Sequence, residues 1–230
     1  MSESEPGNQQ VVAVASPEDF CRHALGELQS LKPSIRGTRV IIGLCGTPGG
    51  GKSTLSDRLA KTAELTGICA VVVPMDGFHL ASAELQRLGR ADRKGAPDTF
   101  DVDGFVHLLT RLRIETMPTV WAPVFHREIE ESFAGELAIE PKHELIIVEG
   151  IHLLQTAYGW DQVLPLLDVA WYLECLDVSD QTARLVQRNI DNGRTPQQAR
   201  DWVETVDMAN MKRIEATKHR AHTHFQLATW

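Results

Sequence analysis

The sequence predicts an α/β fold: a mainly parallel central sheet with helices on both of its faces. Three observations support this prediction. Short apolar runs rich in β-branched residues alternate with longer segments whose apolar residues have helical spacing. The apolar runs are nearly continuous, as expected for strands that are buried on both faces. No repeat or linker divides the 230 residues, which suffice for one large domain.

The N-terminal segment is predicted to consist of a tail and a helix. Residues 1–15 begin with the polar, acidic run "MSESEPGNQQ", and we expect them to be disordered. A helix then begins after Ser16, a favoured N-cap, with Pro17 at its first position and Asp19 three residues after the cap. Residues 16–230 are expected to form a single domain.

The next strand is predicted at residues 39–46, "RVIIGLCG", and a long helix at residues 52–65, where Leu55, Leu59 and Ala63 have helical spacing. A glycine-rich loop joins the two. The same criteria predict further strands at residues 68–74, near 119–125, at 144–150 and at 168–175. They predict helices around residues 82–88, at 102–113 and from 179 onward.

The composition excludes several classes of protein. Lys and Arg total 23 against 31 Asp and Glu, and the net charge of −8 disfavours nucleic-acid binding through a basic surface. The four cysteines form no CxxC pair, so they indicate neither a zinc site nor a disulfide framework. No apolar run approaches the about 20 residues that span a bilayer, and no signal peptide is recognised. We therefore expect a cytoplasmic protein that binds neither nucleic acid nor membrane.

Residues 46–54, "GTPGGGKST", fit the pattern G-x-x-x-x-G-K-[ST] of a phosphate-binding P-loop. In such a loop, backbone N–H groups surround phosphate oxygens, Lys52 reaches the β- and γ-phosphates and Ser53 ligates Mg²⁺. A flexible glycine turn is the alternative, but the position between a strand and a helix favours the P-loop. The nucleotide-binding residues are predicted to be Gly46, Thr47, Pro48, Gly49, Gly50, Gly51, Lys52, Ser53 and Thr54.

This motif refines the fold prediction to a P-loop NTPase three-layer sandwich and implies ATP and Mg²⁺ as cofactors. Three functional classes remain: a small-molecule kinase, a GTPase switch and an ATPase that drives mechanical or metallochaperone work. A GTPase requires N-K-x-D, and the chain contains no Asn-Lys pair. The D-x-x-G match at residues 101–104 begins a predicted helix, which is the wrong context. No second domain that would serve a motor is apparent.

Two acids follow predicted strands, Asp76 in "VVVPMDGFHLA" and Glu149 in "ELIIVEG". Because the carboxyl ends of parallel strands share one edge of a sheet, both acids and the P-loop should face one crevice. Asp76 could accept the proton of a substrate hydroxyl, and Glu149 with Ser53 could order Mg²⁺. Phe78 and His79 are predicted to form the substrate wall; helix capping by Asp76 and core packing by Phe78 are the alternatives.

Arginines later in the chain predict a lid around residues 180–200. Arg184 and Arg188 are four residues apart on one helix face and could stabilise the transferring phosphoryl group. A solvated helix face is the alternative. The segment "GRADRKG" contains Arg93 and Lys94, which either lie in a solvated loop or attract an anionic substrate.

Together these motifs resemble the P-loop kinases that include type I pantothenate kinase, uridine kinase and phosphoribulokinase. The resemblance extends from about residue 40 to the last helices, in "MDGF", "RKGAPDTFDVDGFVHLLTRLR", "APVF" and "IIVEGIHLLQ". The "DGFH" and "APVFHREIEE" segments are most similar to bacterial proteins described as nucleoside/nucleotide kinases or fructose transport system kinases. The resemblance implies the same roles for Asp76, Lys52, Ser53, Glu149 and the lid arginines. It adds three substrate-binding residues, His126, Arg127 and Asn210.

The sequence also departs from these relatives. Where this chain has "DGFH", uridine kinases have a segment similar to "DSFY". Arg127 and Glu130 replace a histidine and a tyrosine of pantothenate kinase, which makes pantothenate a doubtful acceptor. The prediction is an ATP-dependent kinase that phosphorylates a hydroxyl of a sugar, nucleoside or vitamin-like metabolite; the alternative is a nucleotide-binding regulatory or switch protein. The resemblance leaves a homodimer open.

Overall fold

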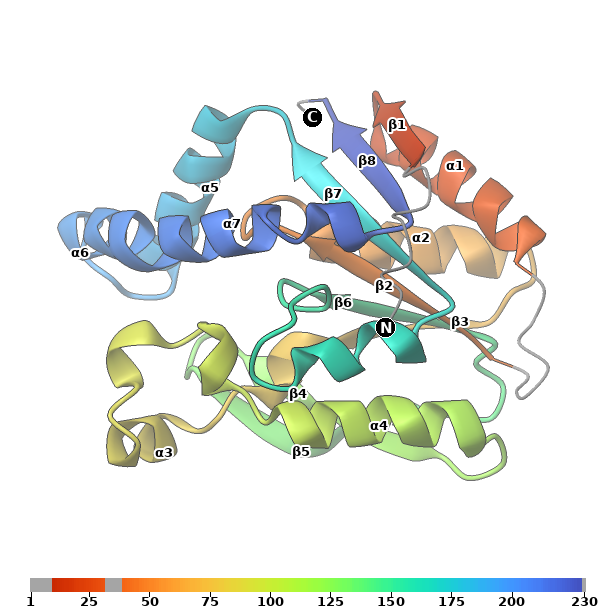
Figure 1. The fold of residues 1–230 in the computed structure, drawn as a ribbon, viewed down its shortest axis with the longest axis horizontal. Coiled ribbons are helices and arrows are strands. Elements are labelled where there is room, and N and C mark those ends of the chain that lie inside the picture. Colours follow the sequence, from red (N-terminus) through yellow and green to blue (C-terminus); the bar gives the residue numbers. More distant parts are fainter. Residues whose placement is uncertain (1–9, 32–38, 229–230) are drawn as a thin grey trace, which may run out of the picture.

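The computed structural model describes residues 10–31 and 39–228. Six parallel strands form the central sheet in the order β1-β8-β7-β2-β6-β3 (Figure 1). Their bounds are Gln10–Val14 for β1, Val40–Gly46 for β2, Ala70–Pro74 for β3, Leu145–Gly150 for β6, Val169–Cys175 for β7 and Thr223–Leu227 for β8. An antiparallel pair, β4 Val120–His126 and β5 Glu131–Ile139, forms a separate hairpin.

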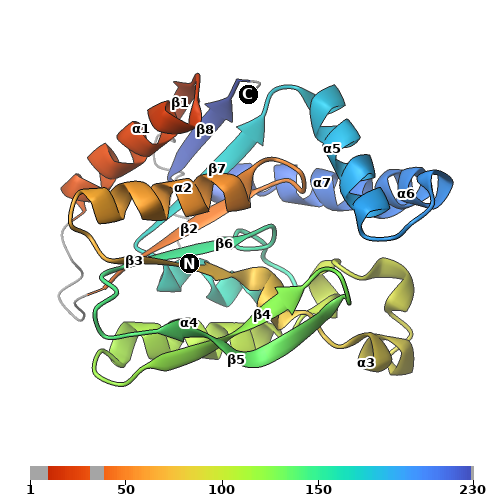
Figure 2. The ribbon, with the colours of Figure 1, turned by 180° about the vertical axis from the view of Figure 1, so that it is seen from behind.

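Helices cover both faces of the sheet, as predicted. The helices α1 and α2 cover one face of the sheet, and α4 and α7 lie beyond the opposite face, as the two opposite views show (Figures 1 and 2). The α-helices are α1 Pro17–Ser30, α2 Lys52–Leu65, α3 Ser82–Arg87, α4 Val102–Ile114, α5 Val178–Asp191, α6 Pro196–Trp202 and α7 Met208–Glu215. A π-helical turn, Val203–Asp207, joins α6 to α7.

The period of two along β2 explains the two hydrophobic layers. Ile41 and Cys45 pack into the cluster that includes α4, whereas Ile42 and Leu44 pack into the cluster that includes α1 and α2. Neighbouring residues of a strand point to opposite faces, so a nearly continuous apolar strand supplies both layers. The predicted three-layer sandwich is therefore confirmed.

The start of α1 follows the sequence signal. Ser16 is the N-cap, and its Oγ accepts a hydrogen bond from the backbone N–H of Asp19 at 3.1 Å. The Asp19 carboxylate in turn accepts from the N–H of Ala15 at 3.0 Å. The first bond satisfies a donor that the first helical turn leaves free, and the second holds the residue before the cap against the same side chain.

Three expectations about strands were wrong. Residues 10–14 were expected to be disordered, but they form β1 and pair with β8; residues 1–9 lie outside the described residues. The segment from residue 179 onward was expected to be helical, but it ends in β8, which lies between β1 and β7. The strand near residues 119–125 was expected in the main sheet, but β4 pairs only with the unpredicted β5.

Local sequence explains why the β4–β5 hairpin was not predicted. Pro123 lies at the irregularity of β4 between Ala122 and Val124, and proline is tolerated at such bulges and at edges because it has no N–H for a ladder. The middle of β5 is exposed and contains Gly135, so it lacks the apolar run of a buried strand.

In the part of the chain that the structure describes, no helix is both long and apolar enough to cross a membrane.

Candidate active site

The candidate site lies at the carboxyl ends of β2, β6 and β3. Glu149 of β6 is in register with Leu44 of β2 on one side and with Pro74 of β3 on the other. The glycine-rich loop follows β2, and a 3₁₀ turn that carries Asp76 follows β3. These segments surround a cavity of about 330 Å³. The predicted convergence of the loop and the two acids is therefore present.

The loop has the geometry that phosphate binding requires. Gly51 is the N-cap of α2 with φ of 83°, and Gly49 has φ of 70°, conformations that favour glycine. Lys52 Nζ donates to the carbonyl oxygen of Thr47 at 2.9 Å, inside the loop. Burial lowers the pKa of Lys52, and the charge of Glu149 opposes that shift.

Most of the predicted loop residues reach the cavity. Those that line it are Pro48, Gly49, Gly51, Lys52, Ser53 and Thr54. Gly46, Thr47 and Gly50 belong to the loop but do not line the cavity. A Cβ at Gly46 would approach the carbonyl oxygen of Leu173 to 2.5 Å, so this glycine permits close packing of the loop on β7.

The sequence did not reveal how α5 holds this loop. The side-chain amide of Gln181, which is buried, donates to Thr47 Oγ1 at 2.7 Å and to the carbonyl oxygen of Pro48 at 2.5 Å. Leu185, one turn later, packs so closely that a Cβ at Gly49 would lie 2.9 Å from its Cγ. A glutamine in a helix carries no local signal of such a contact, because the loop lies more than 130 residues earlier.

Glu149 and Ser53, the two residues predicted to hold Mg²⁺, lie in contact. Ser53 Oγ donates to Glu149 Oε1 at 3.1 Å, and the carboxylate is buried. Burial and the negative charge of Asp76 raise the pKa of Glu149. Within residues 10–31 and 39–228, no cluster of three or more His, Cys, Asp or Glu side chains could hold a metal ion. A hydroxyl and one carboxylate fit Mg²⁺, which is commonly bound by one or two carboxylates together with substrate phosphates.

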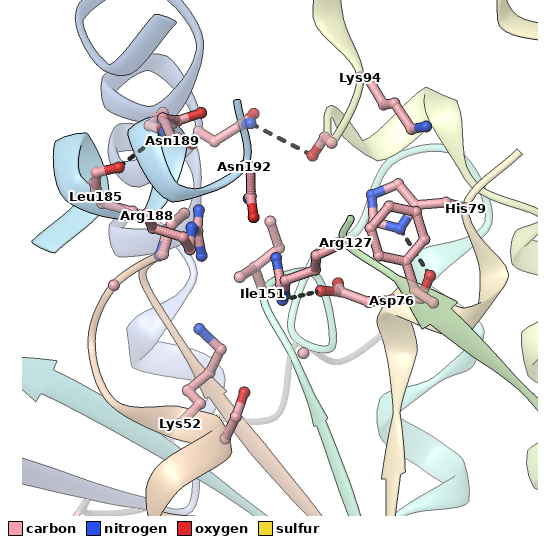
Figure 3. A pocket seen from close by; sticks show the side chains of 18 of the residues that line it. Lys52, Asp76, His79, Lys94, Arg127, Ile151, Leu185, Arg188, Asn189 and Asn192 are labelled. Carbon is pink, nitrogen blue, oxygen red and sulfur yellow. Dashed lines mark hydrogen bonds and ion pairs between the residues drawn. The ribbon is translucent and has the colours of Figure 1, made fainter. Parts of the chain in front are cut away.

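Asp76 is paired with Arg127 across the cavity. Arg127 Nη2 donates to Asp76 Oδ2 at 2.8 Å, and Oδ1 receives no hydrogen bond from any residue that the structure describes (Figure 3). Burial disfavours the carboxylate, but the positive charges of His79, Arg127, Lys52 and Arg188 outweigh it, and the pKa of Asp76 lies below its usual value. Asp76 is therefore ionised at neutral pH and has one oxygen available.

His79 forms part of the cavity wall, as predicted. Its ring lies between those of Phe100 and Phe125, with centroid distances of 4.1 and 4.5 Å, and Nδ1 is 2.7 Å from the carbonyl oxygen of Asp76. Because a carbonyl oxygen can only accept, Nδ1 carries a proton and donates it to the carbonyl oxygen of Asp76. Burial lowers the pKa of His79, and the charge of Asp76 opposes that shift. The Asp76 backbone and the aromatic wall thus fix its orientation.

Both predicted lid arginines line the cavity, but only one has a guanidinium without a partner among the described residues. Arg184 Nη2 is 3.2 Å from Asp180 Oδ2 and 3.3 Å from Cys175 Sγ. The guanidinium of Arg188 has no hydrogen bond or ion pair with the residues described. Figure 3 shows it on the same side of the cavity as Lys52. Arg188 is therefore the better placed of the two to bind a phosphate.

Three predicted substrate residues are not part of the cavity lining. Phe78 packs on Phe105 in the hydrophobic core, with ring centroids 5.2 Å apart. Arg93 forms an ion pair with Asp98 at 2.9 Å. His126 lies between the carboxylates of Glu128 and Glu136. Of the other predicted substrate residues, the cavity is lined by His79, Lys94, Arg127 and Asn210.

The structure adds residues that the sequence did not single out. The further polar side chains that line the cavity are Glu130, Asn189, Asn192, Arg194 and Asp207. They come from the β4–β5 turn, from α5 and the loop after it, and from the π-helical turn. No motif links these segments in the sequence. Glu130 was noted only as a departure from pantothenate kinase, and that departure was the one available signal.

Comparison with known proteins places these features in a family. Residues 41–229 match the model of the phosphoribulokinase/uridine kinase family. A Schizosaccharomyces pombe protein provisionally named a uridine kinase is 35% identical over 185 residues, 77% of this chain and 78% of that protein. The pantothenate kinase of Lacticaseibacillus casei is 32% identical over 120 residues, 51% of this chain and 39% of that enzyme.

A solved structure extends the similarity to the whole fold. A Silicibacter sp. TM1040 protein, provisionally described as a fructose transport system kinase, is 38% identical to this chain. The two superpose with a TM-score of 0.81 over 91% of this chain and 98% of that one.

Proposed function

The chain belongs to the phosphoribulokinase/uridine kinase family, and we propose that it is an ATP- and Mg²⁺-dependent kinase. In this proposal it transfers the γ-phosphoryl group to a hydroxyl of a small metabolite such as a sugar, a nucleoside or a vitamin-like compound. One observation carries the proposal: the phosphate loop, Glu149 and the free oxygen of Asp76 face a single cavity.

The phosphate side of the cavity supplies binding and charge neutralisation. The backbone N–H groups of the loop and Lys52 hold the β- and γ-phosphates, and Arg188 approaches from the proposed lid, residues 180–200. Ser53 and Glu149 would hold Mg²⁺, which neutralises phosphate charge when bound. The chain thus supports a phosphoryl transfer that requires mainly alignment and electrostatic stabilisation.

Asp76 completes the reaction on the opposite side. The substrate hydroxyl oxygen attacks the γ-phosphorus, the bond from phosphorus to the β–γ bridging oxygen breaks, and ADP leaves. The hydroxyl proton passes to Asp76 Oδ1, because Oδ2 is occupied by Arg127. Arg127 holds the carboxylate in place and keeps it ionised.

A regulatory nucleotide switch is less well supported. A switch requires a nucleotide site and a segment that responds to it, whereas this cavity continues past the loop to a carboxylate and an aromatic wall. That additional volume suits a second substrate. We further propose a cytoplasmic location, where ATP is available and the free thiols of Cys21, Cys45, Cys69 and Cys175 stay reduced.

The test is a screen of a metabolite extract with the purified protein and ATP, in which mass spectrometry detects new phosphorylated compounds. We expect a product that depends on the protein and is absent with Lys52→Ala. Lys61→Ala, an exposed lysine of the same helix, is the matched control. Tight ATP binding with no phosphorylated product from any extract would favour the switch instead.

A further inference from the structure

The cavity continues beyond Asp76 into a region that we call the acceptor end. It is lined from the β4–β5 turn, the loop before α4 and residues 194–210. Figure 3 shows two of its side chains, His79 and Lys94, on the opposite side of the cavity from Lys52 and Arg188. The side chains that form it are His79, Lys94, Phe100, Phe125, Arg127, Glu130, Arg194, Asp207 and Asn210. Their charges and hydrogen bonds define which acceptor fits.

The cations of the acceptor end are already engaged within the protein. Lys94 Nζ donates to Ser82 Oγ at 3.0 Å and, through a short bond, to the carbonyl oxygen of Glu130, and its side chain is only 10% exposed. Arg127 binds Asp76, as described above. Lys94 also lies over the ring of Phe125, with Nζ 5.4 Å from the centroid.

Arg194 is similarly held. Its Nη1 donates to Asn189 Oδ1 at 2.7 Å, and its guanidinium stacks over the Trp202 ring at 4.3 Å. A cation with such partners offers fewer free donors to a ligand than an unpaired one. Each of the three cations is also paired with a carboxylate of the cavity, Arg127 with Asp76 and both Lys94 and Arg194 with Glu130. An anionic ligand would therefore compete with those carboxylates for the cations.

The carboxylates of the acceptor end balance these charges but are poorly supplied with hydrogen-bond donors. The oxygens of Glu130 lie 3.8 Å from Lys94 Nζ and 3.7 Å from Arg194 Nη1, and no described residue donates a hydrogen bond to them. Glu130 has φ of 54°, a conformation that non-glycine residues adopt rarely and that is enriched at functional sites. Its carboxylate therefore has unused hydrogen-bond acceptor capacity inside the cavity.

Asp207 provides a second such carboxylate. It lies in the π-helical turn and is 6% exposed, and its one hydrogen bond from a described residue comes from Asn189 Nδ2 at 3.5 Å. Turns of this kind are frequent at functional sites. A buried carboxylate whose oxygens are incompletely hydrogen-bonded is costly, so a ligand that donates to it is favoured.

These observations lead to one conclusion about the acceptor. We infer that it is an uncharged polyhydroxyl compound whose hydroxyl groups donate hydrogen bonds to Glu130 and Asp207. Its less polar face packs on the wall of stacked rings formed by His79, Phe100 and Phe125. A compound that carries a phosphate or carboxylate would bring further hydrogen-bond acceptors and negative charge towards two carboxylates, and is disfavoured.

This inference rests on the proposed kinase activity and can fail separately from it. A metabolite extract is divided by anion exchange at neutral pH into an unbound fraction and an anionic fraction, and each is incubated with the protein and ATP. We expect the new phosphorylated product to arise from the unbound fraction. A product from the anionic fraction alone would overturn the inference and leave the kinase proposal intact. A product from neither fraction would overturn the kinase proposal, and the inference with it.

Variants then test the two carboxylates. With the acceptor recovered from the unbound fraction, Glu130→Gln and Asp207→Asn should each raise the KM for the acceptor about tenfold while the KM for ATP stays within about twofold. The unchanged KM for ATP shows that the variant is folded. Glu128→Gln, two residues away, exposed and outside the cavity lining, is the control for Glu130. An acceptor KM that neither variant changes would contradict the assignment of the carboxylates.

Discussion

The phosphate end and the acceptor end of the cavity differ in which hydrogen-bonding partner they leave free. At the phosphate end, Arg188 and the backbone N–H groups of the glycine-rich loop are available donors. At the acceptor end, Lys94 and Arg194 are paired with Glu130, and the carboxylate oxygens of Glu130 and Asp207 can still accept hydrogen bonds. A polyanion needs hydrogen-bond donors, which the phosphate end offers, and a hydroxyl-rich compound can use the acceptors of the acceptor end. One cavity can thus direct the two ligands to different ends.

The two ends also differ in how they are built. The phosphate end is formed by the loop and helix that follow β2, a central strand of the sheet. The acceptor end is formed largely by the β4–β5 hairpin and irregular segments outside the sheet. A phosphoryl-donor site on a rigid strand can therefore be combined with different acceptor sites on variable segments.

The largest effect is expected at Asp76, where the two ends meet. Asp76→Asn removes the proton acceptor, and we expect kcat to fall about 10²–10⁴-fold while the KM values for ATP and acceptor change little. Steady-state kinetics with both substrates measures this. Asp92→Asn, an exposed acid outside the cavity, is the control. An unchanged kcat for Asp76→Asn alongside an inactive Lys52→Ala would show that Asp76 is not the base.

The next largest effect is expected from the arginine that has no partner. Arg188→Ala should lower kcat about 10²–10³-fold, because a group that stabilises the transferring phosphoryl acts mainly in the transition state. Arg184→Ala should cost less, about tenfold, since Asp180 and Cys175 already engage its guanidinium. Arg200→Ala, exposed on α6, is the control. If Arg184→Ala proved the more damaging variant, the distinction between a free and an engaged arginine would be wrong.

A smaller effect, confined to the phosphate end, is expected from the contact between α5 and the loop. Gln181→Leu leaves Thr47 Oγ1 and the Pro48 carbonyl without their donor, so the loop is less well ordered for phosphate. We expect the KM for ATP to rise about tenfold and the KM for the acceptor to stay unchanged. Gln187→Leu, on the exposed face of α5, should have no such effect. A parallel rise in both KM values would show that the two ends are not independent.

The last effect, on stability and not on activity, is expected behind the acceptor end. His152 is fully buried, its Nε2 lies 2.9 Å from the carbonyl oxygen of Gly95, and burial lowers its pKa to about 4. His152 is protonated near pH 6.5 in the unfolded chain but only near pH 4 in the folded protein. Because the unfolded state binds the proton first, stability is lost as pH falls from about 6.5 to 4. The loss amounts to about 3 kcal/mol in total.

Urea unfolding at pH 7 and pH 5 tests this contribution. His152→Gln should reduce the difference in unfolding free energy between the two pH values, whatever its effect at pH 7. His107→Gln, a histidine of α4, is the control. An equal pH dependence for His152→Gln and the unaltered protein would contradict the role of His152.

The phosphate end and the position of Asp76 follow from local sequence patterns. The spacing of "GTPGGGKST" specifies a loop and a helix start locally, and the strands before the loop, Asp76 and Glu149 are recognisable as continuous apolar runs. Because parallel strands present their carboxyl ends at one edge, these short-range patterns were enough to bring the groups together. The i, i+4 spacing indicated Arg184 and Arg188 together and did not distinguish between them.

The acceptor end and the edges of the sheet depend on long-range contacts instead. Contacts between distant segments pair Arg127 with Asp76 and pack Phe78 into the core. Such contacts also bring Glu130 and Asp207 to the same cavity. The strands β1 and β8 likewise acquire their structure by pairing with each other. A short segment with weak local preference takes its conformation from its neighbours, since packing and cross-strand hydrogen bonds outweigh propensity. The pattern of residues along the chain does not contain that information.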